Sequence, residues 1–323
     1  MYELELTPNT RLLLYPFGNH DQAIRQNLDR AIFHPNTPPK LHAPKRMLKV
    51  HRFTYLSLTR KLCFRQHFAQ RTMSSPAVLA ARAALASIDL TSYDPEQSRL
   101  MDERCILVDE QDNAIGAMDK KTCHLMENIN KGLLHRAFSA FVFRPSDGKL
   151  LLQQRASEKI TFPDMWTNTC CSHPLDDFEE EKIEEGQLGV RSAASRKLEH
   201  ELGIPQSQTP VGEFQYLTKI HYLAPSNGMW GEHEVDYILF LTADVTVTPN
   251  KNEIQDHKYV DKAELQAMFN DSSNSFTPWF KLIARDFLFG WWDTLLERQG
   301  FDGRVYAKTL TGVADGSKVI KMV

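Results

Sequence analysis

The chain has 323 residues, of which 42% are hydrophobic, so it is long enough to bury one large core or two modest ones. Its formal net charge of −3 argues against a protein that wraps nucleic acid, so an anionic partner must be bound by a local cluster of Lys and Arg. The five cysteines include an adjacent pair and favour a reducing compartment over a disulfide framework, and no apolar run reaches the roughly 18 residues of a transmembrane helix.

The chain begins with a basic segment. Between Arg30 and Asp89 there is no acidic residue, whereas Lys and Arg recur throughout. Residues 47–62 are basic, hydroxylated and amphipathic, which is typical of a mitochondrial presequence. A disordered basic tail is one alternative, and a later start codon is another. In each case we predict that residues 1–92 lie outside the folded domain.

The sequence predicts one folded domain at residues 93–306 and a tail at residues 307–323. The tail ends in Val319-Ile-Lys-Met-Val323, which differs from the Ser-Lys-Leu tripeptide that directs proteins to peroxisomes. We therefore expect a cytoplasmic protein, or a mitochondrial one if the basic segment is a presequence, and a peroxisomal location stays open.

Short apolar segments with period-two alternation predict several β-strands. One such segment is followed by the turn Pro145–Gly148, which leads directly into the next strand. The predicted strands are Arg104–Asp109, Ala137–Phe143, Lys149–Arg155, Gly212–Tyr222 and His233–Leu241.

Periodicity and capping residues predict three helices. In Val190–Leu202 apolar residues recur every four positions, and Gly203 ends the helix. The segment Asp261–Glu264 has the form of a capping box that opens a short helix. A last apolar helix begins at Thr277–Pro278. Because helices and strands are mixed without a regular βαβ rhythm, the predicted fold class is α+β.

The most informative motif is Cys170-Cys171-Ser172-His173, which places a thiol two residues from an imidazole in a polar turn. Most lone cysteines are small buried hydrophobes, so the turn alone is weak evidence for catalysis. A second motif, Gly231–Asp236, places Glu232 and Glu234 on one face if it forms a strand. The same alternation turns His233 to the opposite face.

Two further histidines lie in short upstream motifs, His124 in Lys120–His124 and His135 in Leu133–Ala137. Taken singly, each is more often an ordinary histidine than a metal ligand. Together with the histidine of the turn and the two glutamates, they make a nitrogen and oxygen ligand set suited to a divalent metal, with a cysteine beside it.

These four motifs together resemble the type I isopentenyl diphosphate isomerases, and the resemblance covers about Met101 to Asp293. It implies an enzyme that interconverts isopentenyl and dimethylallyl diphosphate by a 1,3-allylic proton transfer. It also implies that Cys171 is the catalytic thiol, paired with Glu234, and that Cys170 belongs to the core. The implied ligands of one tightly bound Zn²⁺ or Mn²⁺ are His124, His135, His173, Glu232 and Glu234.

The resemblance implies further roles around the substrate. Trp279 is the candidate for cation–π stabilisation of a carbocation-like state, with simple packing as the alternative. Tyr222 is the candidate for a hydrogen bond near Glu234, and His221 is interpreted as structural. The basic residues taken singly also fit a solvated charged rim. The residues implied to bind the diphosphate are Lys120, Arg155, Lys159, Ser172 and Lys197.

The helix at residues 190–202 resembles a Nudix box in which two carboxylates are replaced. Residues Arg196–Gly203 keep the arginine, the last glutamate and the glycine. Lys197 and His200 stand where Nudix hydrolases carry acids that hold several Mg²⁺ ions, and Glu201 remains for one Mg²⁺. We therefore expect a Nudix-like mixed sheet flanked by helices, with the hydrolytic chemistry lost.

Two other classes of function stay open on the sequence. A Nudix-type pyrophosphohydrolase would share the fold and the diphosphate site, although the altered box argues against it. A non-catalytic metal-binding or scaffold protein would need an inert Cys171. We expect a monomer whose partner is a small isoprenoid diphosphate, with no nucleic acid bound and no membrane span.

Overall fold

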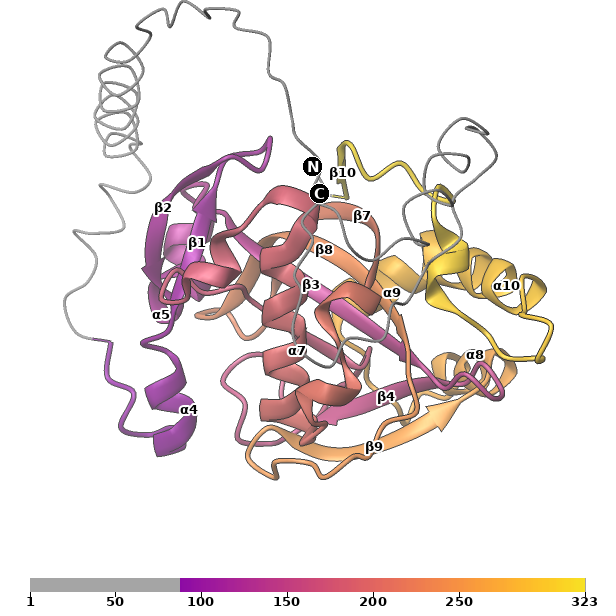
Figure 1. Ribbon diagram of the computed structural model, residues 1–323. Helices are drawn as coiled ribbons and strands as arrows, with labels where there is room; N and C mark the ends of the chain where they lie inside the picture. The colour runs from indigo at the N-terminus through magenta and orange to yellow at the C-terminus, as the bar shows by residue number, and fades with distance from the viewer. Residues whose placement is uncertain (1–87, 323) are drawn as a thin grey trace, which may run out of the picture. The chain divides into compact units, whose positions relative to one another are not determined.

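The computed structural model describes residues 88–322, and a mixed β-sheet forms its centre (Figure 1). In their order across the sheet, the strands of its main path are β10 (Val319–Lys321), β7 (Gln215–Pro225), β8 (Gly231–Thr242), β3 (His135–Phe143), β1 (Arg104–Val108) and β2 (Ala114–Asp119). Strand β3 pairs with β8 in parallel and is buried along its whole length, whereas β8 and β7 are antiparallel. The sheet is therefore mixed, as predicted.

Four further strands lie off this main path and join the sheet through β3 or β4. They are β4 (Leu150–Arg155), β5 (Trp166–Thr167), β6 (Cys170–Ser172) and β9 (Ile254–Val260). Strand β6 pairs antiparallel with the middle of β3, and β4 pairs with the end of β3 and with β9. Strand β3 thus lies between β8 on one edge and β6 on the other, which brings segments from three parts of the chain together.

Apolar side chains alternate between two cores, one on each face of the sheet. Phe141 of β3 packs with α9 (Pro278–Ile283) and α10 (Phe289–Glu297), whereas the next residue, Val142, packs with α7 (Leu188–Leu202). This is the period of two that a strand buried on both faces must show. Helices therefore cover both faces, and the predicted α+β fold with flanking helices is confirmed (Figure 1).

The remaining helices are short. The capping box predicted at Asp261 and Glu264 is present at the start of α8. These helices are α4 (Pro95–Leu100), α5 (Lys120–His124), α6 (Met126–Ile129) and α8 (Lys262–Asn270). The 3₁₀ turns are Glu179–Lys182, Glu185–Gln187, Gln206–Gln208, Val211–Glu213 and Ala307–Leu310. Among residues 88–322, no helix combines the length and the apolar character that crossing a membrane requires.

The packed structure extends beyond the domain predicted at residues 93–306. Ile88 and Leu90 pack against the small apolar cluster around Trp230. At the other end, the buried side chain of Leu310 belongs to the core beneath α10, and β10 pairs in parallel with β7. Both predicted boundaries therefore fall inside the fold, while the prediction for residues 1–87 lies outside the described residues.

Several predicted elements differ in their bounds from the structure, and two of the differences are larger than the others. The last apolar helix is divided into α9 and α10 by a π-helical turn at Ala284–Leu288. The strand predicted from Gly212 begins at Gln215, because Val211–Glu213 forms a 3₁₀ turn after Pro210. Neither difference moves a predicted site residue to another element.

Gly203→Ala is expected to destabilise the protein by about 1–3 kcal/mol. Gly203 ends α7 with a φ of 62°, and a Cβ there would lie 2.1 Å from the carbonyl oxygen of Thr248. The free energy of unfolding in urea measures the effect. Gly290→Ala in α10 is the control, because a Cβ at Gly290 meets nothing within 4 Å. Equal stability of the two variants would contradict this prediction.

Candidate active site

Five residues with metal-binding side chains meet at one point in the structure. Their ligand atoms all lie within 4.8 Å of one another, and all five residues are buried. His135 opens β3 and is the register partner of Glu234 on the parallel strand β8. The residues are those predicted from the sequence, namely His124, His135, His173, Glu232 and Glu234.

The hydrogen bonding of His124 leaves a lone pair directed at this cluster. Its Nδ1 lies 2.7 Å from the carbonyl oxygen of Lys120 and must carry the ring proton, because a carbonyl only accepts. Its Nε2 then presents a lone pair 2.7 Å from Oε2 of Glu232, in a geometry that makes no hydrogen bond. Two buried acceptors this close call for a cation beside them, so the residues fit a divalent metal.

Burial favours the neutral form of the other two histidines. It lowers the pKa of His135, although Glu234 lies 3.3 Å from its Nε2. Burial, followed by the charges of His135 and His124, lowers the pKa of His173 well below its ordinary value. Neutral imidazole is the form that binds a metal, so both residues are in the required state.

Glu234 is held from two sides. Its Oε1 lies 2.8 Å from Nε2 of His173, and its Oε2 accepts a 2.5 Å hydrogen bond from the hydroxyl of Tyr222. Burial alone would raise the pKa of Glu234, but the neighbouring His135 and the hydrogen bond from Tyr222 lower it. Burial and the charge of Glu234 raise the pKa of Tyr222, which therefore stays protonated. Tyr222 thus contacts Glu234, where the sequence reasoning placed it.

The adjacent cysteines point to opposite faces of β6. Cys170 is fully buried in the apolar core beneath α7, and burial raises its pKa. Cys171 is partly exposed and lines a pocket together with Glu234. Burial, followed by the charges of Asp236 and Glu234, raises the pKa of the Cys171 thiol well above its ordinary value. Of the two, only Cys171 is placed to meet a substrate.

A narrow, partly open pocket lies beside Cys171. Trp279 forms part of its wall, where its ring is 2% exposed and lies 5.8 Å from the guanidinium carbon of Arg155. The residue is therefore packed in the core as well as forming part of the pocket lining. The predicted site residues that line the pocket are Lys120, His124, Arg155, Lys159, Cys171, Ser172, His173, Glu201, Tyr222, Glu232, Glu234 and Trp279.

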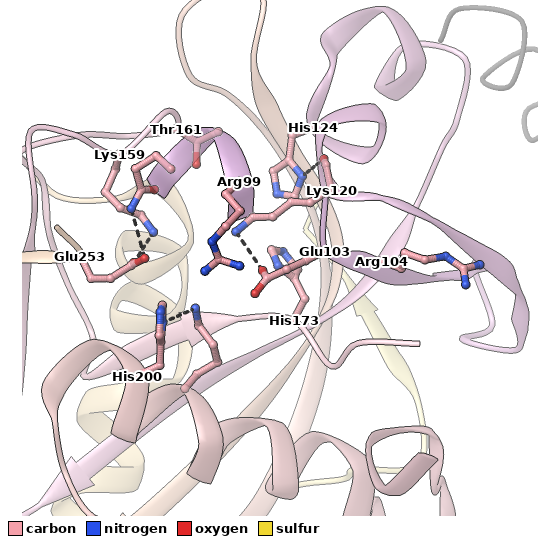
Figure 2. Close-up of polar contacts among 12 residues, drawn as sticks. Arg99, Glu103, Arg104, Lys120, His124, Lys159, Thr161, His173, His200 and Glu253 are labelled. Carbon is pink, nitrogen blue, oxygen red and sulfur yellow. Dashed lines mark hydrogen bonds and ion pairs between the residues drawn. The ribbon is translucent and has the colours of Figure 1, made fainter. Parts of the chain in front are cut away.

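The lysines at the pocket already pair with carboxylates (Figure 2). Lys159 lies 2.6 Å from Glu253, and Lys120 lies 3.8 Å from Glu103. Burial lowers the pKa of Lys159, against the opposing effect of Glu253. Burial alone would raise the pKa of Glu253, but Lys159 is the first of the cations that lower it. The two charges therefore support each other inside the protein.

The guanidinium of Arg155 is fixed by the loop that follows β4. Its Nε donates to the carbonyl of Phe162 at 2.9 Å, and its Nη2 donates to the carbonyl of Thr161 at 2.8 Å. These two hydrogen bonds hold the loop at residues 161–162, and they also place the positive charge of Arg155 in the wall of the pocket.

The chain matches known proteins over most of its length. The NUDIX domain model matches residues 133–280. An isopentenyl-diphosphate delta-isomerase of Phaffia rhodozyma is 65% identical over 253 residues, which is 77% of this chain and 100% of the relative. Isomerases of that name from Schizosaccharomyces pombe and Mus musculus are 57% and 52% identical, over 64% and 65% of this chain and 95% and 93% of theirs. This chain belongs to the isopentenyl-diphosphate delta-isomerases.

In this isomerase, Lys197 of α7 lies behind the pocket wall. Its Nζ is 3.4 Å from Glu201 and 3.1 Å from Nδ1 of His200, and the residue is 1% exposed. Burial alone would lower the pKa of Lys197, but Glu201 and Glu253 raise it. Lys197 thus neutralises Glu201, the glutamate predicted to hold Mg²⁺. Lys197 can make its predicted contact with the substrate only if its ammonium group moves away from Glu201.

The two histidines that the sequence analysis left out of the ligand set contact each other. Nε2 of His221 lies 2.8 Å from Nε2 of His233, and Nδ1 of His233 lies 2.8 Å from the carbonyl oxygen of Leu133. Burial lowers the pKa of His233 to about 4. His233 faces away from the cluster because neighbouring residues of a strand point to opposite faces.

Several polar residues of the isomerase site were missed by the sequence reasoning, among them Ser139, Asp236 and Glu253. Ser139 contacts Cys171, Asp236 contacts Ser139, and Glu253 pairs with Lys159. Asp236 had a usable signal, because it follows Glu234 by two residues and so shares its face of β8. Ser139 and Glu253 had none, because their partners are distant in the sequence.

Proposed function

We propose that the chain carries out the isomerisation of its family in the pocket shared by Cys171 and Glu234. The reaction interconverts isopentenyl and dimethylallyl diphosphate by adding one proton to the allylic unit and removing another. One observation carries the assignment of the site. The thiol of Cys171 and the carboxylate of Glu234 lie on the two strands that flank β3, and both line the same pocket. Glu234 also belongs to the metal-binding cluster, whose other residues include His173.

An unactivated alkene is a poor base, so the reaction needs a positioned acid and base and a pocket that excludes water. Cys171 and Glu234 are proposed as this pair. One gives its proton to the terminal carbon while the other takes a proton from the carbon next to the diphosphate-bearing carbon, and the roles exchange in the reverse direction. The hydroxyl of Tyr222 keeps the carboxylate oriented through its hydrogen bond.

The residues of the cluster are proposed to hold one divalent ion, zinc or manganese, because nitrogen and oxygen ligands suit both metals. When bound, the ion supplies positive charge that fixes the orientation and the protonation state of Glu234. Glu201 is proposed to take part in a second site, for a Mg²⁺ that arrives with the diphosphate, because carboxylate and phosphate oxygens are its preferred ligands.

Basic residues at the pocket are proposed to bind the diphosphate. Lys120, Arg155 and Lys159 line the pocket with Ser172, so one anion can contact several of them. Binding at this end holds the allylic unit in place for proton transfer without touching the reacting carbons. The face of Trp279 is proposed to stabilise the carbocation-like state.

Arg155→Lys and Lys159→Met are each expected to weaken transition-state binding by about 1.5–3 kcal/mol. Lysine at position 155 keeps the charge but loses the fork to the carbonyls of Thr161 and Phe162. Steady-state kinetics should show a higher KM, and metal analysis an unchanged content of tightly bound metal. Arg144→Lys is the control, because Arg144 pairs with Asp147 in an exposed position. Kinetics near wild type in both test variants would place the diphosphate elsewhere.

The proposed chemistry differs from hydrolysis in a directly measurable way. In heavy water the enzyme should exchange deuterium into isopentenyl and dimethylallyl diphosphate and release no phosphate. Phosphate release would support a pyrophosphohydrolase instead, and the absence of both would support a non-catalytic metal-binding protein. The Lys197–Glu201 pair argues against hydrolysis, because a lysine beside the remaining glutamate weakens the binding of several cations.

The site is proposed to work in a monomer, since the metal-binding cluster and the pocket beside Cys171 can be built from residues of a single chain. Light scattering of the purified protein with and without substrate tests this.

The basic segment at residues 1–92 leaves the cytoplasm and the mitochondrion as the proposed compartments, and a fluorescent fusion to its first residues separates the two.

A further inference from the structure

Three polar side chains form a row across three neighbouring strands, next to the metal cluster. Ser139 of β3 is the register partner of Cys171 of β6. On the other edge of β3, Asp236 of β8 shares the face of Glu234. Ser139 and Asp236 are both 0% exposed. The row therefore links the buried interior of the sheet to the thiol in the pocket.

The hydroxyl of Ser139 contacts both neighbours in the row. Its Oγ lies 2.7 Å from Oδ2 of Asp236 and 3.5 Å from Sγ of Cys171. A hydroxyl has one proton and two lone pairs, so it can donate to Asp236 while it accepts from the thiol, or turn its proton toward the sulfur. The 2.7 Å hydrogen bond to Asp236 fixes the oxygen in the first of these arrangements.

A purely structural role is the competing interpretation, and another buried serine shows what that looks like. Ser195 of α7 donates to the carbonyl of Thr209 at 2.8 Å, and this contact ties a helix to a loop. Both partners of Ser139 are instead side chains, and one of them is the sulfur that lines the pocket. The arrangement is suited to orienting Cys171.

We infer that Ser139, held by Asp236, is a positioning residue that fixes the sulfur of Cys171 toward the reacting carbon. The inference rests on the proposed function, because the position of the sulfur affects the rate only if Cys171 transfers a proton. The hydroxyl donates its proton to Asp236 and accepts the hydrogen bond of the thiol, so it holds the sulfur in place for the transfer. Ser139 neither gains nor loses a proton overall, and the sulfur need not move.

Ser139→Ala tests the inference through kcat. Misplacing a reacting group by about 1 Å costs on the order of 100-fold, so kcat should fall by roughly 10- to 100-fold. KM should change by less than about threefold, because the basic residues that bind the diphosphate are untouched. The content of tightly bound metal should also stay unchanged. Wild-type kcat, or a loss of kcat that follows loss of metal, would overturn the inference.

Ser195→Ala is the matched control, because it also removes a buried serine hydroxyl but lies outside the pocket. It should lower the melting temperature without lowering kcat. If Ser139→Ala does not fold, Ser139→Cys makes the same test with a poorer hydrogen-bonding atom in the same place. An unchanged kcat in Ser139→Cys would then count against the inference.

A double-mutant cycle tests whether Asp236 acts through Ser139. Asp236→Asn keeps an oxygen acceptor and should retain most of the activity, whereas Asp236→Ala should lower kcat. The double variant with Ser139→Ala should be about as slow as Ser139→Ala alone, since neighbours in one network are not additive. If the losses of kcat in Asp236→Ala and Ser139→Ala, expressed as free energies, add up in the double variant, the link between Asp236 and Ser139 is overturned.

Cys171→Ala is measured in parallel to separate two failures. An active Cys171→Ala enzyme would disprove the proposed role of the thiol itself. An inactive Cys171→Ala enzyme together with a fully active Ser139→Ala enzyme would disprove only the positioning role.

Discussion

Cys171→Ala should abolish measurable isomerisation, with a loss of at least about 10²- to 10⁴-fold, whereas Cys170→Ala should keep most of the activity. The two thiols are neighbours in the sequence but point to opposite faces of β6. Cys171 lines the pocket, and Cys170 packs in the apolar core beneath α7. Loss of the Cys171 thiol therefore removes one partner of the proposed acid–base pair, while loss of the Cys170 thiol leaves a small cavity and removes a 3.5 Å contact with Glu201.

The measurement is kcat for both variants, together with their free energies of unfolding. Cys170→Ala should be destabilised by on the order of 1 kcal/mol, because a buried atom is removed without a replacement. It serves as the control for the neighbouring substitution, since it deletes the same atom one residue away. A similar loss of activity in both variants would show that the wrong thiol has been assigned, or that neither takes part.

His135→Ala should release the tightly bound divalent metal and remove isomerisation with it. His135 is 0% exposed, and its Nε2 lies 3.3 Å from Glu234, so it supports both the ion and the proposed acid–base group. Replacing residues that merely support metal ligands already costs about 10- to 100-fold in affinity, so loss of a ligand should cost at least that much. Metal analysis after extensive dialysis measures the content.

His221→Ala is the matched control for this experiment. His221 is also a buried histidine, but its Nε2 contacts His233 and it is not part of the cluster. The control should retain both metal and activity. A His135→Ala enzyme that is free of metal but fully active would disprove the role proposed for the ion, and a His221→Ala enzyme without metal would mean that the ligand set is misassigned.

The sequence predicted those parts of the site that depend on local geometry. Glu232 and Glu234 could be placed together, and His233 apart from them, because strand alternation fixes the face of each residue. The assembly of the ligand cluster from four separate segments followed from the family resemblance, since spacing along the chain does not determine which strands become neighbours. The pairing of β3 with β6 and β8 brings three of those segments together, and the fourth, which carries His124, is the helix α5.

Features that depend on distant partners could not be predicted in this way. Glu253 lies in the loop before β9, and its pairing with Lys159 joins residues 94 positions apart. Lys197 and Glu201 are four residues apart on α7, so their pairing could have been predicted, but the burial of the pair depends on the strands packed against the helix. The tail after Tyr306 has little apolar periodicity of its own, and its place in the fold comes from pairing with β7.

The short strand β10 also protects the protein against self-association. It occupies the edge of β7 through the pairs Val319–Lys219 and Lys321–His221, so the polar backbone groups of an eleven-residue strand are not left open along that stretch. β10 itself has only three residues and carries Lys321, and short charged edges are poor templates for another chain. A protein that lacks residues 316–323 should therefore aggregate more readily, even though its catalytic residues remain intact.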